Sequence, residues 1–258
     1  GFTDFYARRL ALRAGLIDLD GFVEAWNTAL AGYAASPARA LPNAEMVKGF
    51  WEDEARHKLP YDRGSLMAAL LDRRIREATH GARNFDAVMF ELRDLAKVGS
   101  PAERGSVADL TPAAVEKVAG IDVLPEIARH IDAGEPILLP ADAFGGCVTV
   151  KTLTLPAFDP GFDRDKSAAT GLIAGVDPAG PAYAAGLRDG FKRLAREGGK
   201  DGDSRVELGY RVADAAGKER VIRYRPEGKA TMTLQELGVQ PGLDAAARAA
   251  CARTVSGG

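Results

Sequence analysis

The apolar residues in the first half of the chain recur at three- and four-residue intervals, the spacing of a helix that buries one face. Such runs cover residues 2–14, 22–33, 64–79 and 85–95. Glycine or proline follows most of them, as is common at helix ends. The pattern predicts that residues 1–135 are all helical.

Residues suited to capping stand before several of these runs. Asp18 or Asp20 can cap the second helix, and Asn84 can cap the fourth. Thr111-Pro112 predicts a further helix start. Residues 99–109, rich in Ser, Gly and charge, are predicted to form a loop.

A different pattern begins near Pro136. Short runs of strand-forming residues are separated there by Gly, Pro and Asp, which is typical of strands joined by turns. The runs are Ile137–Leu139, Cys147–Leu155, Leu172–Val176, Arg205–Val212 and Glu219–Tyr224. A short helix is predicted at Pro181–Ala185, and an Ala-rich helix at Asp244–Arg253.

Together these patterns predict an α+β protein of two domains. The helical domain spans residues 1–135, and a small β domain spans residues 136–238. Residues 239–258 form a C-terminal helix and tail.

The composition is that of a globular protein and narrows the choice of partners. Apolar residues make up 46% of the 258 residues and charged residues 27%, which is ordinary. The formal net charge of −2 gives no electrostatic basis for binding nucleic acid or an anionic membrane. No stretch approaches the roughly 20 apolar residues of a membrane-spanning helix. We therefore expect no nucleic-acid partner and no membrane span.

The two cysteines, Cys147 and Cys251, lie far apart and form no Cys-x-x-Cys unit. In an exported protein they could form a disulfide that ties the C-terminal segment to the middle of the chain. Two unpaired cysteines are the alternative, and the sequence does not choose between them.

Two short motifs have partial metal-ligand spacing. Glu54 and His57 lie at helical spacing, but a solvated helix face is the simpler interpretation. Asp163-x-Asp165-x-Ser167 begins like a calcium loop, yet it lacks the glycine at the sixth position and the glutamate at the twelfth. We interpret it as a charged turn.

Five segments, in order, carry a likeness to a known family. They are Gly1–Tyr6, Arg13–Ile17, Tyr61–Asp72, Asn84–Met89 and Val118–Asp122. Together they resemble the glycyl aminopeptidases, metallopeptidase family 61, whose members carry a PDZ domain after the helical part. Gly180–Leu187 is similar to a Gly-Ser-Pro-Ala-x-x-Ala-Gly-Leu segment of bacterial PDZ domains. The resemblance implies that the helical part is the C-terminal lobe of a thermolysin-like catalytic domain.

The resemblance also implies a zinc ion held by two histidines of a helical H-E-x-x-H motif and by a downstream glutamate. In the family this glutamate directly precedes a Gly-Phe-Thr segment, and this sequence starts with Gly1-Phe2-Thr3. Its three histidines, His57, His80 and His130, include no H-E-x-x-H pair. We therefore expect a C-terminal fragment that binds no zinc and hydrolyses no peptide by itself.

Tyr61 is the one catalytic residue that the resemblance carries over. Related peptidases use the tyrosine of a Tyr-x-x-Gly segment, here Tyr61 to Gly64, to donate a hydrogen bond to the oxyanion of the tetrahedral intermediate. The alternative is a partly buried tyrosine that packs its ring and bonds its hydroxyl within the chain.

The PDZ resemblance implies a groove in which a Gly-rich loop captures a terminal carboxylate and a strand edge takes the peptide. Gly161 and Phe162 are the candidate peptide-binding residues. Phe191 stands where an aspartate usually follows the Ala-Gly-Leu-x-x-Gly segment. The alternative, which this departure favours, is a degenerate domain that packs on or positions the helical part.

The expected function is the removal of small N-terminal residues, such as glycine, from peptides by the intact zinc peptidase. Two rivals are a non-catalytic scaffold and a peptide-binding PDZ module. Phe2 and Phe5 lie in a helix without an N-cap, so their apolar face predicts contact with the missing catalytic part or a homodimer. The family's habit of pairing peptidase and PDZ domains outside the cytoplasm implies a periplasmic or exported protein.

Overall fold

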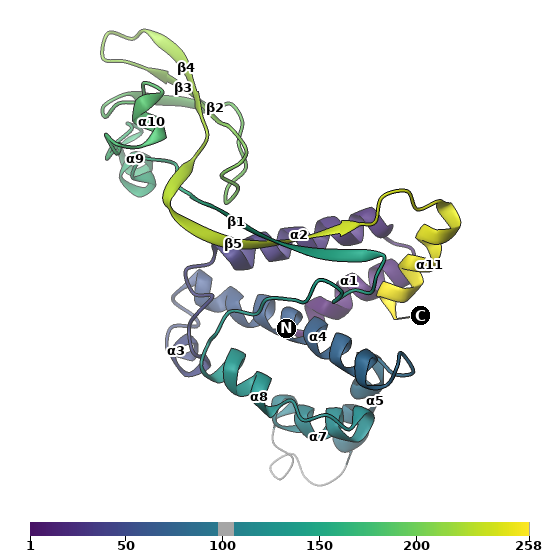
Figure 1. Cartoon of the computed structure of the whole chain (residues 1–258). Coiled ribbons are helices and arrows are strands. Elements are labelled where there is room, and N and C mark those ends of the chain that lie inside the picture. The colour runs from purple at the N-terminus through teal and green to yellow at the C-terminus, as the bar shows by residue number, and fades with distance from the viewer. Residues whose placement is uncertain (98–105, 258) are drawn as a thin grey trace. The chain divides into compact units, whose positions relative to one another are not determined.

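The computed structural model describes residues 1–97 and 106–257. It is a mixed α and β structure with small sheets, as the sequence predicts (Figure 1). Contacts between residues divide the chain into two compact units. We call Gly1–Thr152 with Gln235–Gly258 the helical unit, and Leu153–Leu234 the β unit.

Most of the helices belong to the helical unit. They are α1 (Phe2–Arg13), α2 (Leu19–Ala35), α3 (Asn43–Val47), α4 (Glu54–Ala78), α5 (Phe85–Leu95), α7 (Val107–Ala119), α8 (Leu124–Ile127), the π-helical turn η1 (Ala128–Asp132) and α11 (Ala245–Ser256). Among the described residues, no helix is both long enough and apolar enough to cross a membrane.

The β unit contains two short helices and an antiparallel sheet. Its elements are α9 (Arg164–Thr170), α10 (Pro181–Ala184), β2 (Lys192–Arg196), β3 (Leu208–Ala213) and β4 (Glu219–Tyr224), with the strands in the order β2-β3-β4. Two longer strands, β1 (Val148–Phe158) and β5 (Glu227–Val239), pair with each other and run from one unit into the other.

Capping side chains explain where several helices begin. Asp18, Asn84 and Asp244 each accept a hydrogen bond from a backbone amide of the following first turn, at 2.8, 2.9 and 2.8 Å. The predicted starts of α2 and α5 are thereby confirmed.

The predicted start of α4 is wrong. This helix begins at Glu54, ten residues before the predicted Gly64, because the carboxylate of Asp53 caps it by accepting from the amides of Ala55 and Arg56. The helix continues through Pro60, although proline supplies no amide for the helical ladder.

The predicted start of α7 at Thr111-Pro112 is also wrong. Ser106 and Asp109 form a capping box, so the helix begins at Val107 and carries Pro112 inside it. The predicted loop over residues 99–109 therefore ends at Ser106. Its residues 99–105 lie outside the part of the chain that the structure describes.

In the second half of the chain, β4 is predicted correctly, whereas β2 and β5 are not predicted at all. The run Leu172–Val176 makes only an isolated bridge, between Leu172 and Lys192. The charged turn predicted at Asp163 is wrong as well, because its carboxylate accepts from the amide of Lys166 at 3.0 Å and caps α9.

Amide side chains join the last part of β5 to α2 and to the segment before β1. Asn27 of α2 both donates to and accepts from the backbone of Leu237, at 3.1 and 2.7 Å. Gln235 does the same with Leu139, at 2.9 and 2.8 Å. Residues 136–152 therefore belong to the compact helical unit, whereas the sequence prediction placed them in the β domain.

Aromatic rings fill the space between α1, α2 and α5. Phe5 is buried, with ring centroids 6.3 Å from Trp26 and 6.1 Å from Phe85, and Phe2 packs edge-on against Phe85 at 5.0 Å. The same chain thus covers the apolar face that led us to expect a homodimer or a missing partner. The homodimer stays a prediction, but an exposed apolar face of α1 no longer supports it.

A buried ion pair joins four helices of this unit. Asp72 of α4 accepts from Nη1 of Arg9 at 2.7 Å, from Nε of Arg76 at 2.9 Å and from the amide of Phe85 at 3.0 Å. Arg9, itself only 2% exposed, donates through Nε to the carbonyl of Ser256 at the end of α11. Burial opposes ionisation of Asp72, but the two guanidinium groups outweigh it and lower its pKa.

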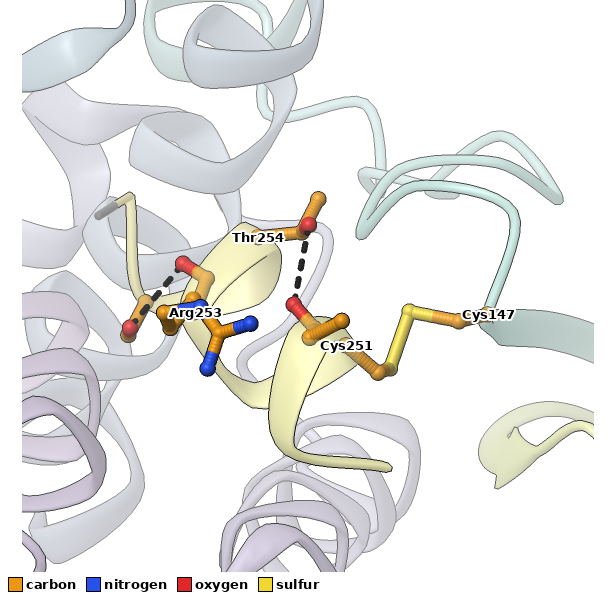
Figure 2. Close-up of a disulfide and its surroundings, with 6 residues drawn as sticks. Cys147, Cys251, Arg253 and Thr254 are labelled. Atoms are coloured by element: carbon orange, nitrogen blue, oxygen red, sulfur yellow. Dashed lines mark hydrogen bonds between the residues drawn. A yellow bond between two sulfur atoms is a disulfide. The ribbon is translucent and has the colours of Figure 1, made fainter. Parts of the chain in front are cut away.

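A disulfide provides a covalent link to α11. Cys147, just before β1, is bonded to Cys251, with 5.8 Å between the two Cα atoms (Figure 2). The pairing that the sequence left open is thus present in the structure. Beyond it, the hydroxyl of Thr254 donates to the carbonyl of Ala250 within the same helix.

Replacing Asp72 by Asn should lower the free energy of unfolding by about 3–5 kcal/mol, because buried Arg9 would lose its nearest carboxylate and keep only Asp86, at 3.8 Å. Urea unfolding followed by circular dichroism measures this loss. Asp20→Asn is the matched control: Asp20 pairs with Arg248 but is 71% exposed, so its loss should stay below about 1 kcal/mol.

The effect of Asp72→Asn should depend on pH with a defined sign. Because folding lowers the pKa of Asp72, its contribution to stability is full above the ordinary carboxyl pKa and is lost as the pH falls through the lowered value. The difference between the wild type and the variant should therefore narrow below about pH 4. A difference that is small at pH 7 and grows towards acid pH would contradict the ion pair.

Removing the disulfide with the double variant Cys147→Ser/Cys251→Ser should cost about 2–5 kcal/mol, because the bond closes a long loop in the unfolded chain. Denaturant titrations of the oxidised wild type and the variant measure the difference. A thiol-reactive reagent that labels the wild type in denaturant without reductant would contradict the pairing.

Candidate active site

Tyr61 lies on the outside of α4 because its neighbours point inward. Asp62 and Arg63 are buried, whereas Tyr61 is 44% exposed. Arg63 donates to the carbonyls of Arg39 and Leu41, at 3.1 and 2.6 Å. These bonds fix this turn of α4 against the segment between α2 and α3 and leave the phenol of Tyr61 facing solvent.

The hydroxyl of Tyr61 has no hydrogen-bond partner within the described chain, unlike those of several other tyrosines. Tyr6 donates to Asp86 at 2.9 Å, Tyr224 donates to the carbonyl of Pro160 at 2.6 Å, and Tyr33 accepts from the amide of Ile137 at 3.1 Å. Tyr61 therefore does not match the alternative of a buried tyrosine bonded within the chain. Its phenol is free to donate to a molecule outside.

The start of the chain packs against the turn of α4 that contains Tyr61, and Figure 1 shows the N-terminus next to α4. A Cβ built on Gly64 would come within 2.6 Å of the Cα of Gly1. One built on Gly1 would come within 2.8 Å of the carbonyl oxygen of Pro60. Only two glycines allow the backbones to approach this closely. The fold thus places Gly1 beside Tyr61, although sixty positions separate them in the sequence.

Three further aromatic side chains form a chain of ring contacts that reaches Tyr61 through His57. His57, one helical turn earlier, has its ring centroid 5.9 Å from that of Tyr61. Phe50 packs edge-on against His57 at 4.8 Å, and Trp51 lies 5.9 Å from His57. We call Phe50, Trp51, His57 and Tyr61 the aromatic cluster. Trp51 is 84% exposed, which is unusual for a residue with this much apolar area.

The charged groups around Tyr61 are mostly paired. Burial raises the pKa of Asp62, and the cations of Lys58, at 4.0 Å, and Arg8 oppose this rise. Burial likewise lowers the pKa of Arg8, whose guanidinium lies 4.9 Å from the centroid of the Trp26 ring. Arg8 and Asp62 therefore attract each other electrostatically across α1 and α4.

The described residues do not supply a zinc site. No group of three or more His, Cys, Asp or Glu side chains in that part of the chain is placed to hold a metal ion. His57 belongs to the aromatic cluster, and the ring of buried His130 is hydrogen-bonded to the carbonyl of Glu135 at 2.9 Å. Glu54 and His57 are both exposed, and no third ligand joins them among the described residues.

Gly161 and Phe162, the candidate peptide-binding residues, lie in the β unit and both face inward. The amide of Gly161 donates to the carboxylate of Asp159 at 2.8 Å. Phe162 is 7% exposed and packs edge-on against Tyr210 at 5.5 Å. A Cβ on Gly161 would lie 2.7 Å from that of Ala182, so this glycine is needed for packing against α10.

The chain that follows Phe162 does not form a strand. Asp163 caps α9 there, so no strand edge continues from the Gly161 loop. A PDZ-type groove needs both a free amide for the carboxylate and an adjoining strand edge for the peptide. In the β unit the Asp159 carboxylate already occupies the amide of Gly161.

A pocket of about 510 Å³ lies elsewhere in the helical unit, between the end of α4 and the end of α11. Its cations are already bonded: Arg73 forms a two-pronged pair with Asp142, and Arg76 binds Asp72. These side chains leave no unpaired charge for a ligand, so the pocket is a weaker candidate than the surface around Tyr61.

Sequence reasoning missed the neighbours of Tyr61. His57 and Tyr61 stand four residues apart, which places them on one helix face, but the predicted helix began only at Gly64. Recognising Asp53 as an N-cap would have extended the helix and revealed this pair. Nothing in the spacing indicates that Phe50 and Trp51, which precede the helix, join them.

A scan of protein-family models gives no match to this chain, and no curated protein is significantly similar to it. The likeness to metallopeptidase family 61 therefore stays a prediction. The choice of the surface around Tyr61 as the candidate site depends on the contacts and exposure described above.

Gly64→Ala should lower the free energy of unfolding by about 1–3 kcal/mol, because the new methyl group would collide with the backbone of Gly1. Gly32→Ala, also inside a helix, is the matched control. Its methyl group would meet only the flexible end of Lys58, so this variant should be neutral or more stable by up to about 1 kcal/mol. Equal effects of the two variants in urea unfolding would contradict the close approach.

Proposed function

We propose that this chain is the C-terminal part of a zinc aminopeptidase that removes small N-terminal residues, such as glycine, from peptides. The observation that carries the proposal is the contact of Gly1 with the Pro60–Gly64 turn of α4. The family resemblance assigns the metal-binding glutamate to the position before Gly1 and the oxyanion donor to Tyr61. Gly1, the residue after the first of these positions, packs against the turn of α4 that contains Tyr61, and this contact supports the proposal.

The exposure of Tyr61 and its free hydroxyl support the same proposal. A phenol held on a rigid helix can donate a hydrogen bond to the peptide carbonyl oxygen as that oxygen gains negative charge. Buried Arg63 and Asp62 would act as positioning residues, because they fix the turn that carries Tyr61. Since the described residues do not fit a zinc ion, the proposal assigns the metal ligands to a preceding segment.

The rival function, peptide binding by a PDZ-like domain, has less support. Gly161 and Phe162 serve packing within the β unit, which favours a degenerate domain. The disulfide between Cys147 and Cys251 supports an exported or periplasmic location, because such bonds persist in oxidising compartments.

The test begins with the coding sequence directly upstream of Gly1, which should encode H-E-x-x-H, then about 18 residues, then a glutamate next to Gly1. The chain joined to that segment should release glycine from glycyl p-nitroanilide, whereas the chain alone should neither bind stoichiometric zinc nor hydrolyse it. In the active protein, Tyr61→Phe should lower kcat by about 100- to 1000-fold.

Tyr183→Phe is the control for this variant, because Tyr183 lies in the β unit beneath the guanidinium of Arg188. It should leave kcat unchanged. Absence of the upstream ligands, or an active protein in which both substitutions have the same effect, would overturn the proposal.

A further inference from the structure

The aromatic cluster carries an uncompensated negative charge at its exposed end. Residues 45–62 contain five carboxylates and three cationic side chains. All three cations are paired, in Glu45–Lys48 at 2.6 Å, Asp53–Arg56 at 3.6 Å and Asp62–Lys58 at 4.0 Å. Within the described chain, Glu52 and Glu54 have no ion-pair partner, and both are exposed.

These two carboxylates follow Trp51 by one and three positions in the sequence. The Trp51 ring meets Phe50 edge-on at 4.8 Å and is otherwise largely exposed. An exposed indole face attracts a cation, and a guanidinium also stacks on it. The surface therefore combines two features that favour a cationic ligand: an open aromatic face and adjacent unpaired carboxylates. A purely apolar partner would offer no positive charge to pair with Glu52 and Glu54.

The distance between Trp51 and Tyr61 determines which positively charged group of a bound peptide can reach Trp51. Trp51 reaches Tyr61 only through His57, by two successive ring contacts of 5.9 Å. The amino terminus of an aminopeptidase substrate lies next to the carbonyl that Tyr61 would contact, so it would stay close to Tyr61. A long basic side chain on the following residue has the reach to extend towards Trp51.

Resting on the proposed function, we propose that Trp51, with Glu52 and Glu54, binds an arginine side chain of the peptide substrate. The substrates are then peptides in which a basic residue follows the small N-terminal residue. The guanidinium stacks on the Trp51 indole and pairs with the two carboxylates.

Trp51 supplies its own reporter, because the only other tryptophan, Trp26, is 1% exposed. Titration of the chain with the tripeptide Gly-Arg-Gly should change the tryptophan emission saturably, with a millimolar Kd. Gly-citrulline-Gly has nearly the same shape without the charge and should bind about fivefold more weakly. Equal affinities for the two peptides, or no saturable change, would overturn the proposal.

The double variant Glu52→Gln/Glu54→Gln keeps the reporter and should weaken binding of Gly-Arg-Gly about threefold or more. Glu219→Gln/Glu227→Gln removes two exposed carboxylates from the β unit and should leave the Kd unchanged. Equal losses in the two double variants would overturn the site. Trp51→Leu should abolish binding of Gly-Arg-Gly that calorimetry can measure. Binding retained by this variant would also overturn the site.

The proposed function and this inference can fail separately. An active aminopeptidase that depends on Tyr61 but has the same kcat/KM for Gly-Arg and Gly-citrulline substrates would reject only the arginine site. Selective binding of Gly-Arg-Gly without any hydrolysis that depends on Tyr61 would overturn the assignment of arginine to a substrate.

Discussion

The pair between Arg9 and Asp72 is the constraint on which the helical unit depends. Asp72 accepts hydrogen bonds from α1, from α4 itself and from the first amide of α5, while Arg9 also reaches the end of α11. A buried charge without a partner is costly, so α1 cannot move away from α4 without exposing or unpairing these charges. The amide of Phe85 and the carbonyl of Ser256 bring α5 and α11 into the same network, so it favours one relative placement of the four helices.

That placement is what creates the candidate active site. Asp72 and Tyr61 belong to the same helix, three turns apart, and Arg9 and Gly1 belong to α1 and its start. When the ion pair fixes α1 along α4, the two glycines meet and the first residue comes to lie beside the tyrosine. The Arg63 hydrogen bonds fix the same turn from the other side, and neither contact uses the hydroxyl of Tyr61.

Local signals in the sequence predicted the parts of this fold that local chemistry decides. Asn84 and Asp18 cap their helices as expected, since a capping side chain acts within three residues. The errors arose where tertiary contacts override local preference. The helix predicted from Gly64 in fact starts at Glu54 and passes through Pro60. All five residues of β2 are exposed, so this strand has no alternation of buried and exposed positions to recognise. Tyr61 could be predicted by resemblance alone, and its aromatic neighbours only from the fold.

The β unit illustrates how a motif can be present for packing rather than for binding. Ala182 and Leu187, from the segment that resembles a PDZ motif, are fully buried, and Gly161 is small because Ala182 lies against it. The Asp159 carboxylate occupies the amide that a peptide carboxylate would need. A peptide carboxylate would have to displace the carboxylate of Asp159. Asp159 is part of the chain and loses no translational freedom when it binds, so the exchange disfavours peptide binding. The free phenol of Tyr61 and the exposed carboxylates near Trp51 lie instead on the helical unit, so recognition of an outside molecule is better supported there.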